Sequence, residues 1–366
     1  MKVSPDILSL TPYQPGKPIS EAKREFGLDT VFKLASNENA FGASPAALQA
    51  IQSELPEIHR YPDAAAFQMV QTYSKMMGVP ANEIAFGNGS NELIDLLIRI
   101  YCEPGDAIVT SKAAFIAYKI CAQAARVRTV ETPLMNSGQF DLKSIQSILE
   151  NDSRVRLVFI ANPNNPTGTY VNRAALEDFL QVCSNREVLV VLDEAYFEFV
   201  RATDYASGTE LRKKFRNVVV LRTMSKVYGL AALRVGFAIA PASVIDLIHR
   251  VRNPFNVGSL AQAATVAALG DQDHVKKVCE LTWTGLDFLG RELTSLGLRF
   301  FPSQANFLLV DCKQDSEKLF NALLKDGVIV RPVKNYGLPT HLRISVGLEE
   351  ENHAVINGLR RIFVAR

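Results

Sequence analysis

Short apolar runs alternate with helical patterns through the middle of this chain. Runs such as Val188–Leu192 are continuous and β-branched, which is typical of strands covered on both faces. Strands are predicted at 83–86, 107–111, 127–131, 155–161, 188–193, 217–222 and 236–240. Helices are predicted near 91–101, 115–125, 141–150, 173–184 and 241–252. Strands that alternate with crossover helices indicate an α/β fold with a largely parallel sheet.

The pattern changes after Gly258. A long helical segment, 258–296, is interrupted near Gly270 and Asp271. Strands are then predicted at 298–301, 305–311, 328–333 and 341–346, and helices at 315–326 and 349–365. This pattern indicates a second, smaller α+β domain.

The first 30 residues are rich in proline and show little periodicity. Such a segment is typical of an extended arm that lies on the body or on a partner subunit. We therefore expect an arm at 1–30, a large domain at 31–260 and a small domain at 261–366.

Composition narrows the class of protein. The 366 residues include 40 basic and 38 acidic side chains, so no polybasic surface points to nucleic acid or to an anionic membrane. The five cysteines are far apart, as expected for reduced thiols. The five histidines show no ligand spacing, and no metal site is expected. No apolar run reaches 18 residues and no signal sequence precedes the arm, so we expect a soluble cytoplasmic protein.

One stretch carries the most informative chemistry. The apolar run Val218–Leu221 is followed by Thr223, Ser225 and Lys226, and Arg234 comes eight residues later. A lysine just past a central strand is partly desolvated, which lowers its pKa and frees its amine as a nucleophile. Hydroxyls and an arginine around it suit a phosphate group. Together they suggest a Schiff-base lysine that holds pyridoxal phosphate, although a surface lysine and a helix-capping serine would also fit this stretch alone.

Further polar and aromatic residues follow earlier strands. Asn165 and Asp193 come after strands 155–161 and 188–192, Tyr196 lies three residues beyond Asp193, and Phe115 follows strand 107–111. Ligands of α/β sheets bind beyond the carboxyl ends of the strands, so these groups can converge on one crevice with Lys226. An acid beside a pyridine nitrogen keeps that nitrogen protonated, and an aromatic side chain can stack on the ring.

A glycine-rich turn, 87–92, joins a strand to a helix. Such a turn exposes backbone N–H groups at a helix N-terminus and forms a natural anion site. It matches neither G-x-G-x-x-G nor a P-loop, so a plain turn is an equal alternative.

Three motifs resemble those of the fold type I aminotransferases that use pyridoxal phosphate. They are N-P-N-N-P-T-G at 162–168, D-E-A-Y at 193–196 and S-K-x-x-G-L-x-x-x-R at 225–234. More narrowly, the chain resembles the histidinol-phosphate aminotransferases over nearly its whole length. The markers of this subgroup lie at 11–13, 35–39, 61–63, 89–94 and 330–332. Aromatic-amino-acid aminotransferases share several of these markers.

The resemblance implies a large domain with a mostly parallel seven-stranded sheet, a smaller α+β C-terminal domain and a set of site residues. Lys226 would bind the cofactor and move the substrate proton, and Asp193 would pair with the ring nitrogen. Tyr196 and Asn165 would contact the ring hydroxyl, and Phe115 would stack on the ring. Many relatives have tyrosine at this last position, so any hydrogen bond from that hydroxyl is lost here.

The resemblance also implies how two anionic groups are bound. The cofactor phosphate would be held by Ser90, Asn91, Ser225 and Arg234, with Thr223 nearby and Tyr61 reaching it from the other subunit of a homodimer. The substrate's anionic group would be bound by Tyr13, Arg331 and Arg343, with Asn165 beside them.

The implied reaction is transamination of L-histidinol phosphate with 2-oxoglutarate, in histidine biosynthesis, giving imidazole acetol phosphate and glutamate. An aromatic-amino-acid aminotransferase is the main alternative, followed by a decarboxylase of the same fold. A ligand-sensing module is disfavoured because the chain has no room for a DNA-binding head.

Overall fold

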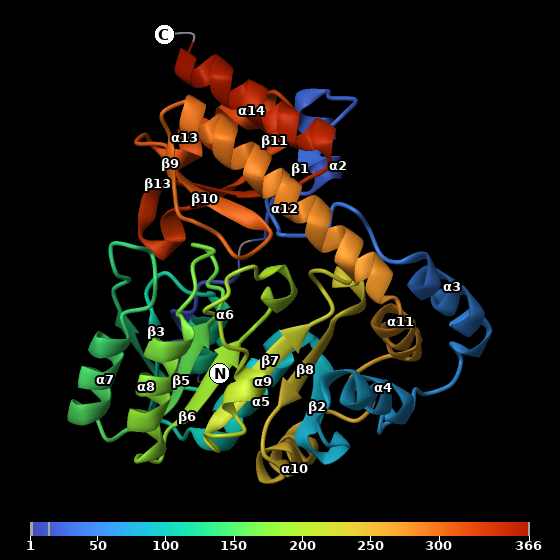
Figure 1. Cartoon of the computed structure of the whole chain (residues 1–366), viewed down its shortest axis with the longest axis vertical. Coiled ribbons are helices and arrows are strands. Elements are labelled where there is room, and N and C mark those ends of the chain that lie inside the picture. Colours follow the sequence, from blue (N-terminus) through green and yellow to red (C-terminus); the bar gives the residue numbers. More distant parts are fainter. Residues whose placement is uncertain (1–2, 14, 365–366) are drawn as a thin grey trace.

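A computed structural model describes residues 3–13 and 15–364, and its centre is a seven-stranded sheet (Figure 1). The strands are β2 (Ile84–Asn88), β3 (Ala107–Ser111), β4 (Arg128–Thr132), β5 (Val155–Ala161), β6 (Leu189–Asp193), β7 (Val218–Thr223) and β8 (Val235–Ile239). Their order is β2-β8-β7-β6-β5-β3-β4. Strand β8 is antiparallel to both neighbours, and the strands from β7 to β4 are parallel. The predicted α/β fold is confirmed, with strand ends shifted by a few residues.

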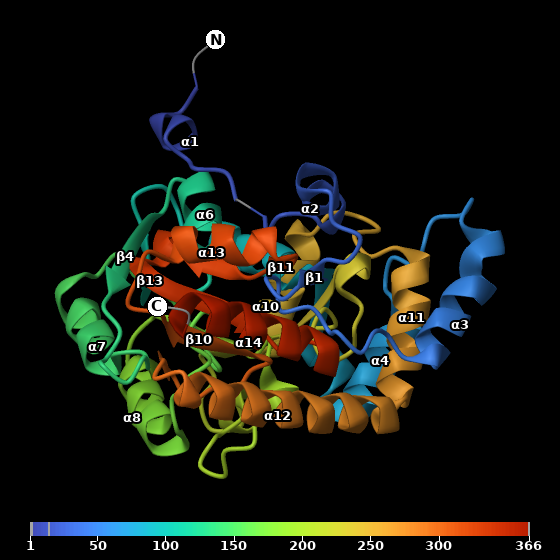
Figure 2. The ribbon, with the colours of Figure 1, turned by 90° about the horizontal axis from the view of Figure 1, so that it is seen from above.

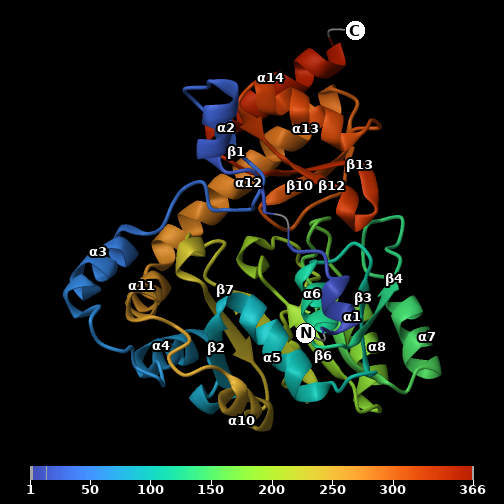
Figure 3. The same cartoon turned by 180° about the vertical axis from the view of Figure 1, so that it is seen from behind.

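Helices cover both faces of this sheet. They include α5 (Gly89–Tyr101), α6 (Ala117–Ala124), α7 (Leu142–Asn151), α8 (Arg173–Ser184), α9 (Gly208–Leu211) and α10 (Ala242–Val251). Helix α8 lies in front of the sheet in Figure 1, whereas α5 lies in front of it in the opposite view of Figure 3. Helices α3 (Pro45–Glu54) and α4 (Phe67–Met77) lie to one side, packed on α11 (Ser259–Gly270).

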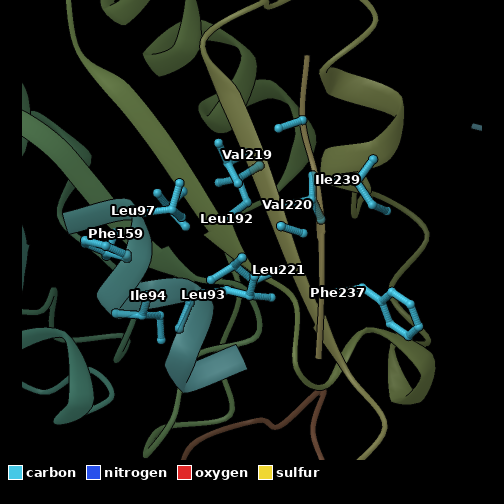
Figure 4. Close-up of a cluster of buried hydrophobic side chains, with 14 of the residues drawn as sticks. Leu93, Ile94, Leu97, Phe159, Leu192, Val219, Val220, Leu221, Phe237 and Ile239 are labelled. Carbon is cyan, nitrogen blue, oxygen red and sulfur yellow. The ribbon is translucent and has the colours of Figure 1, made fainter. Parts of the chain in front are cut away.

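The main core lies between the sheet and helix α5. Figure 4 shows Leu93, Ile94 and Leu97 of α5 beside side chains of the central strands. The strand residues labelled there are at most 1% exposed: Phe159, Leu192, Val219, Val220, Leu221, Phe237 and Ile239. Each fully buried aliphatic or aromatic side chain of this kind stabilises the fold by about 1.5–3 kcal/mol. This packing fixes the N-terminus of α5 next to the ends of the central strands.

A second sheet forms the upper part of Figure 1, in the order β12-β13-β10-β9. Its strands are β9 (Arg299–Phe300), β10 (Phe307–Asp311), β12 (Arg331–Val333) and β13 (Leu338–Ser345), all antiparallel to their neighbours. Helices α12 (Gln272–Ser295), α13 (Ser316–Lys325) and α14 (Glu349–Val364) accompany it. The predicted strand 328–333 is wrong as one element, because β11 (Val328–Ile329) and β12 belong to different sheets.

The predicted interruption of the long helical segment is confirmed. Helix α11 ends at Gly270, and Asp271 caps α12 by accepting a hydrogen bond from the backbone N–H of His274. The new helix axis carries α12 diagonally from α11 to the second sheet (Figure 1). Helix α12 therefore links α11 to the second sheet, where it contacts β9 and β10.

The N-terminal segment is more structured than the predicted extended arm. Residues Pro5–Leu8 form α1, which lies beside α6 (Figure 3). Residues Ile19–Phe26 form α2, which ends at Gly27 in the left-handed conformation, so the extended arm is wrong there. Beyond it, β1 (Phe32–Lys33) pairs in parallel with β11, and Figure 2 shows α2 and β1 beside β11 and α13. The domain limits at 30/31 and 260/261 stay predictions.

Two further expectations concern the environment of the protein. The five cysteines are free thiols. Within residues 3–13 and 15–364, no helix combines the length and the apolar character needed to cross a membrane. The predicted cytoplasmic location stays a prediction.

Candidate active site

One cavity lies where the ends of the central strands meet the second sheet. It is lined by thirteen of the fourteen residues that the sequence predicts for the site: Tyr13, Ser90, Asn91, Phe115, Asn165, Asp193, Tyr196, Thr223, Ser225, Lys226, Arg234, Arg331 and Arg343. They come from segments more than 300 residues apart in the chain. The fold therefore brings these side chains together, and Tyr61 is the exception.

Lys226 follows β7 by three residues, and part of its side chain faces the cavity. The pKa of its amine is lowered from 10.5 to about 8, chiefly by burial and then by the nearby guanidinium groups of Arg343 and Arg234, against the opposing charges of Glu38 and Asp193. A sizeable fraction of this amine is therefore neutral near pH 8, which is the nucleophilic form.

Asp193 is the last residue of β6 and is 4% exposed. Its Oδ2 accepts a hydrogen bond of 2.6 Å from the hydroxyl of Tyr118, and its Oδ1 accepts one of 3.2 Å from the backbone N–H of Ala195. Burial raises the pKa of this carboxyl, and the two donors oppose that rise. Sequence reasoning missed Tyr118, although its position three residues after Phe115 could have suggested a shared site.

Hydrogen bonds join the second sheet to the part of the cavity lined by Asn165 and Tyr196. Arg343 of β13 donates to Asn165 Oδ1 at 2.6 Å and to the backbone carbonyl of Ala35 at 2.6 Å. Asn37 Nδ2 donates to the hydroxyl oxygen of Tyr196 at 2.9 Å, which leaves the Tyr196 proton available for another acceptor. Asn37 lies in one of the subgroup markers, but the sequence alone assigned it no role.

The part of the cavity lining near the start of α5 is electropositive. Helix α5 begins at Gly89, and the guanidinium of Arg234 lies against that glycine: a Cβ there would be 2.4 Å from Arg234 Nη2. Arg234 also donates to Ser225 Oγ at 3.2 Å. Within the part of the chain that the structure describes, no carboxylate lies within ion-pair distance of Arg234. A helix N-terminus and a guanidinium side by side are both electropositive, so the site favours a phosphate-like anion.

A pair of arginines also lines the cavity. Arg331 and Arg343 are directly opposite each other on the paired strands β12 and β13. Arg343 is only 7% exposed, and its Nε has no hydrogen-bond partner among the described residues. Tyr13, which is 58% exposed, lines the same region. Two guanidinium groups in this arrangement suit a second anionic group.

Comparison with known proteins identifies the family. The model of the family described as "Aminotransferase class I and II" matches residues 29–359. The chain is 49% identical to the histidinol-phosphate aminotransferase of Bdellovibrio bacteriovorus, over 99% of this chain and 98% of that protein. It is 47% identical to the enzyme of the same name from an Anaeromyxobacter species, over 99% of each chain. The chain belongs to the class I and II aminotransferases.

A solved structure confirms the architecture of this aminotransferase. The crystal structure of histidinol-phosphate aminotransferase from Sinorhizobium meliloti, in complex with pyridoxal-5'-phosphate, superposes with a TM-score of 0.90 at 27% identity. The match covers 100% of this chain and 98% of that one. The predicted fold type I architecture is therefore confirmed, as is the resemblance to histidinol-phosphate aminotransferases.

Tyr61 does not line the cavity of this aminotransferase. Its side chain is 83% exposed and stacks on Phe255, with 4.7 Å between the ring centroids. Other large apolar side chains of the same region are also exposed: Leu48, Leu55, Ile58 and Phe67. Within one chain Tyr61 thus has no place at the site, and its predicted role depends on a second subunit.

Arg222, Glu194 and Glu198 form a buried charged layer beside the cavity, and sequence reasoning missed it. Arg222 of β7 donates through Nε to Glu194 Oε2 at 2.8 Å, and its guanidinium lies 3.5 Å from the centroid of the Phe197 ring. Glu198 is the second carboxylate near this single cation, 3.9 Å from Arg222. Burial raises the pKa of Glu198 to about 7, although Arg222 opposes the rise. The layer holds the segment that carries Asp193 and Tyr196 against β7.

Proposed function

We propose that this aminotransferase binds pyridoxal phosphate in the cavity and transfers an amino group between L-histidinol phosphate and 2-oxoglutarate. The observation that carries the proposal is one cavity lined by the Lys226 amine, the buried Asp193 carboxylate and two separate cationic ends. When bound, pyridoxal phosphate supplies an electron sink for the negative charge that develops at the substrate Cα.

The residues at the centre of the cavity fit this cofactor. The partly neutral amine of Lys226 could attack the carbonyl carbon of the cofactor, with loss of water. Once the substrate amine had displaced it from that carbon, the freed Lys226 amine could carry the proton of the substrate Cα. The carboxylate of Asp193 can hold the proton on the ring nitrogen. Phe115 offers an apolar face to the ring, and the Tyr196 proton is free for the ring oxygen because Asn37 donates to Tyr196 from the other side.

The anion site at the N-terminus of α5 fits the cofactor phosphate. Ser90 and Asn91 supply the first turn of that helix, and Ser225 and Arg234 close the opposite wall. Thr223 Oγ1 supports the wall by accepting a hydrogen bond from the backbone N–H of Ser225 at 3.1 Å. The close contact between Gly89 and Arg234 explains why position 89 is a glycine, because any side chain there would clash with the guanidinium.

The arginine pair, with Tyr13 and Asn165 beside it, fits the anionic group of the substrates. Arg331 and Arg343 can bind the phosphate of histidinol phosphate in one half of the reaction and a carboxylate of glutamate or 2-oxoglutarate in the other. The names of the relatives with 49% and 47% identity favour histidinol phosphate.

Steady-state kinetics test the substrate. Histidinol phosphate, phenylalanine and tyrosine should be compared as amino donors to 2-oxoglutarate, and we expect the highest kcat/KM for histidinol phosphate. Arg331→Leu should lower that kcat/KM by at least about tenfold because it removes a cation from the arginine pair. Arg299→Leu is the matched control, since Arg299 is exposed on β9 and does not line this cavity. A kcat/KM for phenylalanine or tyrosine that equals or exceeds the value for histidinol phosphate would indicate an aromatic-amino-acid aminotransferase instead.

We also propose that the enzyme is a homodimer in which Tyr61 completes the phosphate site of the partner subunit. The exposed apolar surface formed by Leu48, Leu55, Ile58, Tyr61 and Phe67 supports this arrangement, because burial of such a surface favours association.

Complementation between two damaged chains tests the dimer. Lys226→Ala and Tyr61→Phe chains with different tags are refolded together, and mixed dimers are assayed at limiting cofactor. If Tyr61 acts across the interface, each mixed dimer contains one intact site with native Lys226 and native Tyr61, and its activity exceeds the mean of the parents. If Tyr61 acts within its own chain, no intact site forms and activity stays at that mean.

A further inference from the structure

Tyr118 lies wholly inside the protein and touches the acid of the site. It belongs to α6, has no exposed surface, and donates a hydrogen bond of 2.6 Å to Asp193 Oδ2. The two residues are 75 positions apart in the chain. Bonds from a neutral donor to a charged carboxylate are short and strong compared with bonds between neutral groups.

The ring of Tyr118 is fixed by two aromatic neighbours. It stacks on Phe159 of β5 with 4.8 Å between centroids and 18° between planes. It also meets the Phe115 ring edge to face, with 5.8 Å between centroids and 89° between planes. Phe115 lines the cavity, and Phe159 belongs to the buried core drawn in Figure 4. Tyr118 therefore contacts both groups that would hold the cofactor ring, the acid and the stacking side chain.

The hydrogen bonds of Asp193 explain what the hydroxyl can do. Tyr118 and the backbone N–H of Ala195 each donate to one carboxylate oxygen. Burial raises the pKa of the Asp193 carboxyl, and the Tyr118 hydrogen bond is the largest effect that opposes it. Burial and the charge of Asp193 also raise the pKa of the Tyr118 phenol well above its ordinary value, so the hydroxyl keeps its proton and stays a donor.

We propose that Tyr118 is a positioning residue of the reaction: its hydroxyl keeps Asp193 in the charged form that holds a proton on the cofactor ring nitrogen, and its ring supports Phe115. The inference rests on the proposed binding of pyridoxal phosphate. A donor that stabilises the carboxylate lowers its affinity for the proton, so the proton remains on the ring nitrogen instead of moving to Asp193. Without that donor, the proton of the ring nitrogen can move to the Asp193 carboxylate, which leaves a neutral acid beside a neutral ring.

Tyr118→Phe in the holoenzyme tests the proposal, with ¹⁵N-labelled pyridoxal phosphate as the probe. In the wild type the ring nitrogen should show the ¹⁵N chemical shift of a protonated pyridine. In Tyr118→Phe the signal should move toward that of a neutral pyridine. We also expect kcat to fall by about tenfold to a hundredfold, as for the loss of a hydrogen bond to a charged group, with a smaller change in KM.

Tyr73→Phe is the matched control. Tyr73 is 2% exposed and stacks on Phe237 at 3.9 Å, so this variant loses a phenolic hydroxyl from an equally buried tyrosine. Its ring-nitrogen shift should equal that of the wild type. If Tyr118→Phe folds poorly, Tyr118→Met fills the space with an adaptable side chain that has no donor, and the same shift is measured.

Two different failures are distinguishable. If a folded Tyr118 variant binds the cofactor and shows the wild-type ¹⁵N shift and kcat, the role of Tyr118 is refuted while the proposed function stands. If the wild type itself binds no pyridoxal phosphate, the proposed function fails first.

Discussion

The pKa of the Lys226 amine gives a prediction that needs no substrate. The structure lowers this pKa from 10.5 to about 8, chiefly through burial and then through the charge of Arg343. At pH 7.5 the neutral amine is therefore roughly 200-fold more abundant at Lys226 than at a lysine with the ordinary pKa. This excess of neutral amine is what prepares the residue to react with a carbonyl carbon.

Trace labelling with acetic anhydride measures that pKa in the cofactor-free protein. The protein is labelled between pH 6 and pH 11 and digested, and mass spectrometry gives the labelled fraction of each lysine peptide. The labelling rate of Lys226 should reach half of its plateau near pH 8, and the midpoint does not depend on how accessible the amine is. Lys276, whose side chain is 77% exposed, is the internal reference. If the rate at Lys226 still climbs steeply above pH 10, the account of the site electrostatics is wrong.

Two further predictions concern carboxylates. In the proposed mechanism the Asp193 carboxylate holds a proton on the cofactor ring, so Asp193→Asn should lower kcat by about a hundredfold or more, roughly 3 kcal/mol, and a variant with near-normal kcat would contradict the assignment. Glu198→Gln should change how stability depends on pH. Because the folded pKa of Glu198 is raised from 4.5 to about 7, the native state binds this proton more tightly than the unfolded chain, and stability is lost as pH rises through that window. Urea unfolding should show similar stability for both proteins near pH 4.5 and an advantage of about 3 kcal/mol for Glu198→Gln at pH 8. Glu280→Gln, at a side chain that is 57% exposed, should show no such advantage, and an equal pH slope in wild type and Glu198→Gln would refute the idea.

The sequence predicted the fold best where the pattern was strongest. Continuous apolar runs gave β5, β6 and β7 within two residues of their observed ends, because strands buried on both faces leave little room for polar residues. The helix α2 was missed because its eight residues bury only Ala22 fully, which gives a short and mostly polar segment. The strands β11 and β12 were merged because Val330, between them, is apolar and as buried as Ile329, so the sequence shows no break there.

The site was predicted from residues with a chemical signature, and the rest of it depends on tertiary contacts. Lys226, Asp193 and Arg234 stand in motifs, so their meeting in one cavity could be expected before the fold was known. Tyr118 and Asn37 form hydrogen bonds to residues 75 and 159 positions away, and no local sequence pattern predicts such partners.

The most direct test of the central claim is to locate the cofactor on the chain. The purified protein should be yellow, and borohydride should bleach this colour irreversibly by fixing pyridoxal phosphate to one lysine. Digestion and mass spectrometry should place the adduct on the peptide that contains Lys226. An adduct on another lysine, or no adduct in a protein that remains active, would contradict the account.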